Sequence, residues 1–201
     1  FRDAQIDYPS SFADLYEAKV KDKPQPDPHQ VKAIEDVAAG LQSSDRGQMI
    51  MACGTGKTFT TLWIKEALDA HTTLVLLPSL SLLSQTMREW AWAGNTHFDI
   101  LNVCSDKSVG KKTEDMDPTD APFPVTSEVE EIAEFLKQPK PKIVFCTYQS
   151  SDLIAQAQLD DAVPTFDLAV ADEAHRCAGK ADAGFATILD GEKIKASKRL
   201  F

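Results

Sequence analysis

The segment Met51-Ala52-Cys53-Gly54-Thr55-Gly56-Lys57-Thr58 lies between a predicted strand over 48–52 and a predicted helix over 57–70. Its last five residues, GTGKT, match the core of a phosphate-binding loop. Two glycines allow the backbone to curl until its N–H groups point at phosphate oxygens. The helix that follows presents the positive end of its dipole to the same phosphates. The residues expected to bind a nucleotide are Gly54, Thr55, Gly56, Lys57 and Thr58.

Two side chains of this loop have separate expected roles. Lys57 supplies a cation to the β- and γ-phosphate oxygens, and the Thr58 hydroxyl is suited to ligate Mg²⁺. The strict motif has glycine five residues before Gly56, where this chain has Met51. A chance glycine turn is therefore the alternative interpretation. The order of strand, glycine loop and helix favours the phosphate site.

An acidic motif, Asp172-Glu173-Ala174-His175, follows a predicted strand over 168–171. Carboxylates at the end of a buried strand are costly unless something positive meets them, and Mg²⁺ beside a phosphate loop is such a partner. We expect Asp172 to hold the metal through water and Glu173 to orient or deprotonate the attacking water. His175 is suited to pass the nucleotide state to neighbouring elements. An ordinary strand-to-helix turn with acidic caps is the alternative.

Apolar and amphipathic segments alternate on both sides of these motifs. Further strands are predicted at 72–77, 98–104, 142–148 and from 198, and further helices at 11–20, 29–41, 81–90, 127–136 and 153–158. The strands are apolar on both faces, so the pattern predicts an α/β fold with a mainly parallel sheet flanked by helices. Ligands of such sheets bind at the carboxyl ends of the strands. Ser127 and Glu130 have the spacing of a capping box, and 105–126 reads as a long surface loop.

Composition limits the class of protein. The 201 residues include 21 Lys+Arg and 31 Asp+Glu, a formal net charge of −10. With 43% hydrophobic and 26% charged residues, the composition is globular rather than disordered. The charge argues against a surface coated for nucleic acid, although a local groove is compatible with it. No run approaches the roughly 20 apolar residues of a membrane span, so no membrane partner is expected. Four cysteines without CxxC spacing argue against zinc and favour a reduced, cytoplasmic protein.

The two motifs together resemble those of superfamily 2 helicases and translocases. Residues 51–58 resemble motif I of that family, and DEAH at 172–175 resembles motif II. Three weaker elements extend the likeness over residues 26–201: Pro28-His29-Gln30, PSLSLLSQ at 78–85 and CTYQS at 146–150. They resemble, in that order, the adenine-reading Q element, motif Ia and a later strand-binding motif. The resemblance implies a RecA-like P-loop domain and helicase-type ATPase activity with ATP and Mg²⁺ as cofactors.

The weaker elements imply further contacts. Gln30 is expected to bond the adenine edge, and Ser79, Gln85 and Thr147 are expected to contact nucleic acid. Motif Ia lacks its usual arginine, so that contact is expected to rest on backbone amides and hydroxyls. The alternatives are that Gln30 is only a polar residue at a helix start and that the serines are solvated helix positions. Trp63, Trp90 and Trp92 are expected in the core or at its rim rather than as base-stacking platforms.

Within the superfamily, four sequence stretches most resemble restriction-enzyme motors, of type I or III or of single-polypeptide restriction–modification enzymes. They are MACGTGKTFT, PSLSLLSQTMREW, TYQS and DEAHR. This implies ATP hydrolysis that drives movement on double-stranded DNA. Residues 1–25 are then an extension or linker, and 26–201 the first RecA-like domain, ending before motif III. A second RecA-like domain, and nuclease or methyltransferase domains, are expected partners in the full-length chain. Without the second domain's arginine fingers, the lobe alone is expected to be nearly inactive. An RNA helicase lobe and an ATPase switch acting on a protein remain alternatives.

Overall fold

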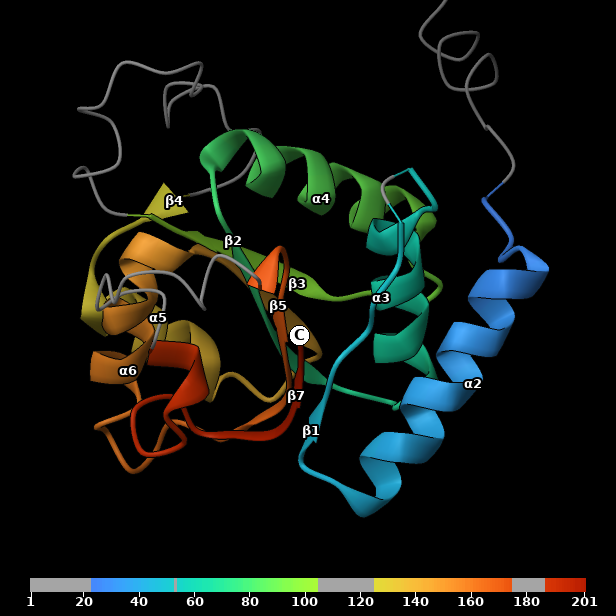
Figure 1. Cartoon of the computed structure of the whole chain (residues 1–201). Coiled ribbons are helices and arrows are strands. Elements are labelled where there is room, and N and C mark those ends of the chain that lie inside the picture. The colour runs from blue at the N-terminus through green and yellow to red at the C-terminus, as the bar shows by residue number, and fades with distance from the viewer. Residues whose placement is uncertain (1–22, 53, 105–124, 175–186) are drawn as a thin grey trace, which may run out of the picture.

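A seven-stranded sheet lies between two layers of helices in the computed structural model, which describes residues 23–52, 54–104, 125–174 and 187–201 (Figure 1). The strand order is β1-β7-β6-β2-β5-β3-β4, and every pairing within this sheet is parallel. The strands are β1 Arg46–Gly47, β2 Thr72–Leu77, β3 Asp99–Val103, β4 Val125–Thr126, β5 Lys142–Thr147, β6 Phe166–Ala171 and β7 Ala196–Leu200. The expected α/β fold with a parallel sheet is confirmed.

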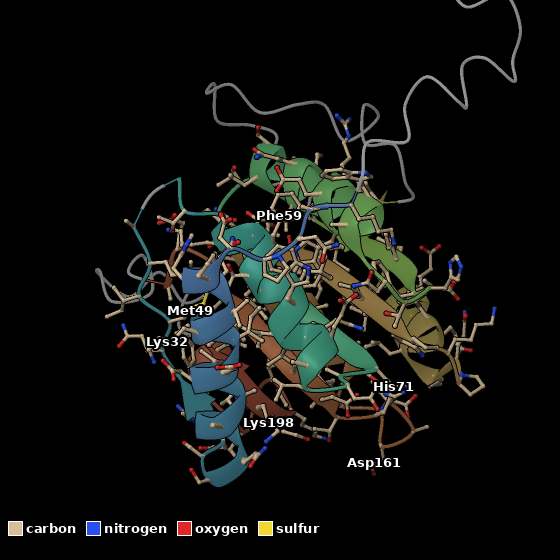
Figure 2. The ribbon with its side chains drawn as sticks, turned by 90° about the vertical axis from the view of Figure 1, so that its right-hand side faces the viewer. Lys32, Met49, Phe59, His71, Asp161 and Lys198 are labelled. Atoms are coloured by element: carbon tan, nitrogen blue, oxygen red, sulfur yellow. The ribbon has the colours of Figure 1, made fainter. Side chains whose placement is uncertain are left out.

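The helices divide between the two faces of the sheet. One face carries α2 (Pro28–Ser43), α3 (Lys57–Ala67) and α4 (Leu80–Ala93). The other carries α5 (Val129–Lys137), α6 (Ser151–Ala157) and the short 3₁₀ helix η5 (Thr187–Leu189), and a second 3₁₀ helix, η3 (Tyr148–Ser150), follows β5. Figure 2 looks onto the first face, with Lys32 on α2 and Phe59 on α3.

The central strands explain why both faces are covered. Successive side chains of a strand point to opposite faces. In β2, Leu74 and Leu76 therefore pack under α5 and α6, whereas Val75 and Leu77 pack under α3 and α4. All four side chains are at most 2% exposed. Strands that bury both faces need helices on both sides, which the long apolar runs of the sequence predicted.

The predicted strand over 48–52 is wrong by several residues. The paired residues are Arg46 and Gly47, and they lie at the edge of the sheet beside β7. The Met49 N–H still donates to the Phe201 carbonyl at 2.7 Å, but Ile50 is 86% exposed. The apolar run therefore leaves the sheet after Met49 instead of continuing within it.

The start of α5 also differs from the expectation. Glu128 rather than Ser127 is the N-cap, and the predicted capping box does not form. Thr126 takes its place: its hydroxyl accepts from the Glu128 N–H at 3.0 Å and donates to the Glu131 carboxylate at 2.6 Å. Thr126 belongs to the edge strand β4, which pairs with β3 and was expected to be loop. A two-residue strand has no periodicity to read, so only its partner reveals it.

The remaining helices have the expected places with shifted ends. α3 stops at Ala67 rather than residue 70, α4 is longer than predicted at both ends, and α6 begins two residues early. Four of the predicted features lie wholly or mostly outside the described residues. They are the helix over 11–20, most of the 105–126 loop, most of the 1–25 extension, and His175. In the described part of the chain, no helix has the length and apolarity needed to cross a membrane.

Candidate functional site

The glycine loop has the curled backbone that phosphate binding requires. Gly54 has φ 78° and Gly56 has φ 77°, both in the left-handed region that side chains rarely adopt. Gly56 is also the N-cap of α3, so the N-terminus of this helix opens directly from the loop. Thr55 closes the turn, because its hydroxyl donates to the Ala52 carbonyl at 2.7 Å. The loop therefore leads directly into the positive end of the α3 dipole, which favours a phosphate there.

Gln30 connects α2 to this loop. The side chain is 5% exposed, and its Oε1 accepts from the Asp27 N–H at 2.8 Å. Its Nε2 donates to the carbonyls of Thr55 and Gly56 at 3.2 and 3.3 Å. A Cβ atom at position 56 would lie 2.5 Å from this Nε2, so a side chain there would displace the Gln30 amide from the loop carbonyls. Gln30 thus caps its helix and holds the loop, while a contact with adenine stays a prediction.

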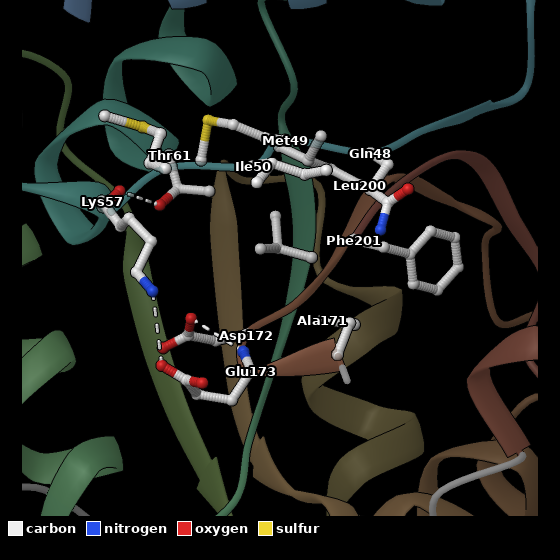
Figure 3. Close-up of a pocket in the computed structure, with 13 residues that line it drawn as sticks. Gln48, Met49, Ile50, Lys57, Thr61, Ala171, Asp172, Glu173, Leu200 and Phe201 are labelled. Carbon is white, nitrogen blue, oxygen red and sulfur yellow. Dashed lines mark hydrogen bonds and ion pairs between the residues drawn. The ribbon is translucent and has the colours of Figure 1, made fainter. Parts of the chain in front are cut away.

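The acidic residues reach the loop from the carboxyl end of β6. The Asp172 N–H donates to the Leu76 carbonyl at 3.0 Å and extends the pairing of β6 with β2. Glu173 follows with φ 54°, an unfavourable conformation for a residue with a Cβ. Its Oε1 lies 3.4 Å from Lys57 Nζ, and both side chains are about 30% exposed (Figure 3). Residues 116 positions apart in sequence therefore form one charged pair.

Asp172 and Glu173 have different surroundings. Burial raises the pKa of the Asp172 carboxyl, and the nearby Glu173 charge adds to this effect. The backbone N–H of Glu173, 3.0 Å from Asp172 Oδ1, and the Lys57 ammonium act in the opposite direction on the same pKa. A partly buried carboxylate with a costly charge is suited to hold a cation.

The oxygen atoms available at this site suit Mg²⁺ better than a metal whose ligands all come from the protein. The described residues contain no cluster of three or more His, Cys, Asp or Glu side chains that would hold a metal alone. Mg²⁺ is commonly bound by one or two carboxylates, with substrate phosphates and waters as its other ligands. That Asp172 and the Thr58 hydroxyl act as such ligands stays a prediction.

An open cavity of about 310 Å³ adjoins these charged groups. The residues after β1 and the start of α3 form one wall, and the ends of β6 and β7 form the other. Lys57, Asp172 and Glu173 make one side polar, whereas Met49 and Phe201 make the opposite side apolar (Figure 3). The cavity lies where a parallel sheet places its ligands.

Asp172→Asn is expected to raise the thermal unfolding temperature at pH 7–8 without nucleotide and magnesium. The folded protein has the higher Asp172 pKa, so ionised Asp172 opposes folding above that pKa. The cost fades as pH falls through the raised pKa, and the gain of the variant should shrink toward pH 4. Differential scanning calorimetry from pH 4 to 8 measures this, with Asp161→Asn on the exposed turn before β6 as control. A lower unfolding temperature in Asp172→Asn at pH 7–8 would contradict it.

The three residues expected to contact nucleic acid lie on α4, with its N-cap, and at the end of β5. Ser79 is the N-cap of α4, where its hydroxyl accepts from the Leu82 N–H at 3.3 Å. Gln85 is exposed on α4 and bonds Glu89 at 2.9 Å. Thr147 is 1% exposed at the end of β5, directly opposite Leu77 of β2. The parallel pairing brings Ser79 and Thr147 to one edge of the sheet. Their contact with nucleic acid stays a prediction.

Two aromatic side chains make hydrogen bonds at this site that the sequence did not predict. Trp90 is 1% exposed, as expected for a core tryptophan, and its Nε1 donates to the Thr58 carbonyl at 2.9 Å. Tyr148 is fully buried, and its hydroxyl donates to the Asp172 carbonyl at 2.7 Å. Local sequence carries no signal for either bond, because each partner lies on a distant element. Trp63 is also in the core, whereas Trp92 is 40% exposed at its rim.

Comparison with protein families gives a match over residues 23–200 to the model described as the res subunit of type III restriction enzymes. Among curated proteins, a probable helicase of African swine fever virus is 33% identical over 141 residues. That alignment covers 70% of this chain and 15% of the viral protein. The chain therefore spans about one seventh of the length of this relative.

Two solved structures resemble the chain over most of its length. The ATP-dependent type ISP restriction-modification enzyme LlaBIII, bound to DNA, is 34% identical with a TM-score of 0.79 over 90% of this chain and 13% of its own. A nuclease-deletion mutant of the type ISP enzyme LlaGI, in complex with a DNA substrate mimic, is 33% identical. Its TM-score is 0.72 over 88% of this chain and 17% of its own.

Proposed function

The chain belongs to the family of the type III restriction enzyme res subunit, and from this premise we propose that it is the ATP-binding lobe of a motor that moves on duplex DNA. The likeness to LlaBIII confirms the RecA-like fold that the motifs implied. The observation that carries the proposal is the meeting of Lys57 and Glu173 at the mouth of the phosphate loop. A cation for phosphate and a carboxylate for water there are the pair that nucleoside triphosphate hydrolysis needs.

Each residue of the site has a proposed task in hydrolysis. The loop N–H groups and Lys57 bind the β- and γ-phosphates, while Thr58 and Asp172 hold Mg²⁺, Asp172 through water. Bound Mg²⁺ neutralises charge on the phosphate oxygens. Glu173 orients the attacking water and accepts its proton, because its carboxylate lies beside Lys57 and therefore near the γ-phosphate position. Nucleotide binding must first displace the Lys57–Glu173 pair.

DNA as the partner is supported by the two type ISP enzymes, which are described as bound to DNA or to a DNA substrate mimic. We place a second RecA-like domain opposite the γ-phosphate, and nuclease or methyltransferase domains elsewhere in the full-length chain. This chain aligns with 13–17% of the length of those enzymes, so these further domains are inferred from the relatives. We further propose that residues 26–201 form the first domain, that His175 is a coupling residue and that the protein is cytoplasmic.

Nucleic-acid dependence of ATP hydrolysis tests this function. We expect duplex DNA to stimulate phosphate release by the full-length protein several-fold, with RNA having little effect. The measurement is steady-state phosphate release with duplex DNA, with structured RNA and with neither, and Glu173→Gln serves as the inactive control. Stimulation by RNA alone would instead indicate an RNA helicase. Equal rates in all three conditions would favour a switch that acts on a protein partner.

A further inference from the structure

Tyr148 bridges two strands that are not neighbours in the sheet. It is the first residue after β5, whereas Asp172 is the first residue after β6, and β2 lies between these strands. The Tyr148 side chain is fully buried, and its hydroxyl spans this distance to donate to the Asp172 carbonyl at 2.7 Å. The phenol thus connects the TYQS segment directly to the acidic motif.

The hydrogen bond fixes the peptide from which Glu173 extends. The Asp172 N–H is already held by the Leu76 carbonyl at 3.0 Å, so Tyr148 holds the same residue from its other side. The Asp172 carbonyl and the Glu173 N–H belong to one planar peptide unit. Fixing that carbonyl therefore fixes the plane that leads into the left-handed backbone of Glu173, at φ 54°. Such a conformation persists only where its surroundings impose it.

The other end of the bridge lies in the segment that is expected to contact nucleic acid. Thr147 Oγ1 and Ser150 Oγ lie 3.0 Å apart, and the Ser151 hydroxyl donates to the Tyr148 carbonyl at 2.8 Å. All of these side chains are at most 1% exposed. Residues 147–151 are therefore tied to one another, so a displacement of Thr147 also displaces Tyr148.

We propose that Tyr148 is a positioning residue that couples nucleic-acid binding at the 147–151 segment to the Glu173 carboxylate, through its hydrogen bond with the Asp172 carbonyl. This inference rests on the proposed function, because it assumes that DNA stimulates hydrolysis. The Tyr148 hydroxyl bonds the peptide from which Glu173 extends, so its effect is expected on the rate of hydrolysis rather than on ATP binding.

The test is Tyr148→Phe in the full-length protein, which removes one hydroxyl and keeps the ring. We expect the DNA-stimulated kcat to fall roughly threefold to tenfold, as loss of one hydrogen bond predicts. The rate without DNA should fall less, so the stimulation factor decreases, while KM for ATP stays unchanged. The measurements are phosphate release with and without duplex DNA, over a range of ATP concentrations, and thermal unfolding.

Thr187→Val is the matched control. It also removes a buried hydroxyl, the one that donates a hydrogen bond to Asp152 of α6 at 2.9 Å. Its stimulation factor should equal that of the wild type. An unchanged stimulation factor in folded Tyr148→Phe would overturn the inference, as would loss of its unfolding transition, which would assign the hydroxyl to stability. If DNA fails to stimulate the wild type, the proposed function itself is wrong, and that result is visible before any variant is compared.

Discussion

Glu173→Gln is expected to reduce ATP hydrolysis by the full-length protein about 10²–10⁴-fold, the usual contribution of a general base. The amide keeps the shape of the side chain but neither accepts a proton nor orients water as a carboxylate does. ATP binding should persist or become tighter. Glu173 lies 3.4 Å from Lys57 before nucleotide arrives, and the uncharged amide competes less for the lysine that the phosphates need.

Two measurements separate these effects. Steady-state phosphate release reports hydrolysis, and isothermal titration with ATP and Mg²⁺ reports affinity. Glu192→Gln is the control, since Glu192 is an exposed carboxylate on the turn between η5 and β7, away from the cavity. Turnover by Glu173→Gln within a few-fold of the wild type would show that another group activates water. A large loss of affinity would show that Glu173 serves binding.

Lys57→Ala is expected to weaken ATP binding about 10- to 150-fold. A hydrogen bond to a charged group contributes about 1.5–3 kcal/mol, which corresponds to this range. Lys57 is the cation at the first position of α3, where its ammonium and the helix dipole act on the same phosphates. Hydrolysis should be lost as well, because the γ-phosphate no longer has this positive partner in the site.

Isothermal titration with ATP and Mg²⁺ measures this loss, with thermal unfolding to show that the variant is folded. Lys32→Ala is the matched control: Lys32 is an exposed lysine on α2 that pairs with Asp36 at 2.7 Å. Its ATP affinity should equal that of the wild type. Unchanged affinity in Lys57→Ala would exclude the phosphate loop as the nucleotide site.

The sequence predicted those parts of the fold whose signal is local. The strand over 72–77 is observed with the predicted bounds, because two β-branched threonines followed by four apolar residues have few alternatives to a central strand. The glycines of the phosphate loop adopt the left-handed backbone that their type allows. The two short edge strands were predicted wrongly: β1 was expected over residues 48–52, and β4 was expected to be loop. Short edge strands exist only through their partner, so the local pattern does not define them.

The sequence alone determined which residue types the candidate site offers. A glycine loop ending in Lys57 and Thr58, and a buried strand ending in Asp172 and Glu173, predict phosphate and metal ligands from local sequence. The tertiary structure decided which of these groups meet. Lys57 reaches Glu173 because the acidic motif ends a central strand at the edge of the sheet where α3 begins. Tyr148 reaches the Asp172 carbonyl because only one strand, β2, lies between β5 and β6. Such contacts depend on strand order and on packing between distant segments, which no local periodicity encodes.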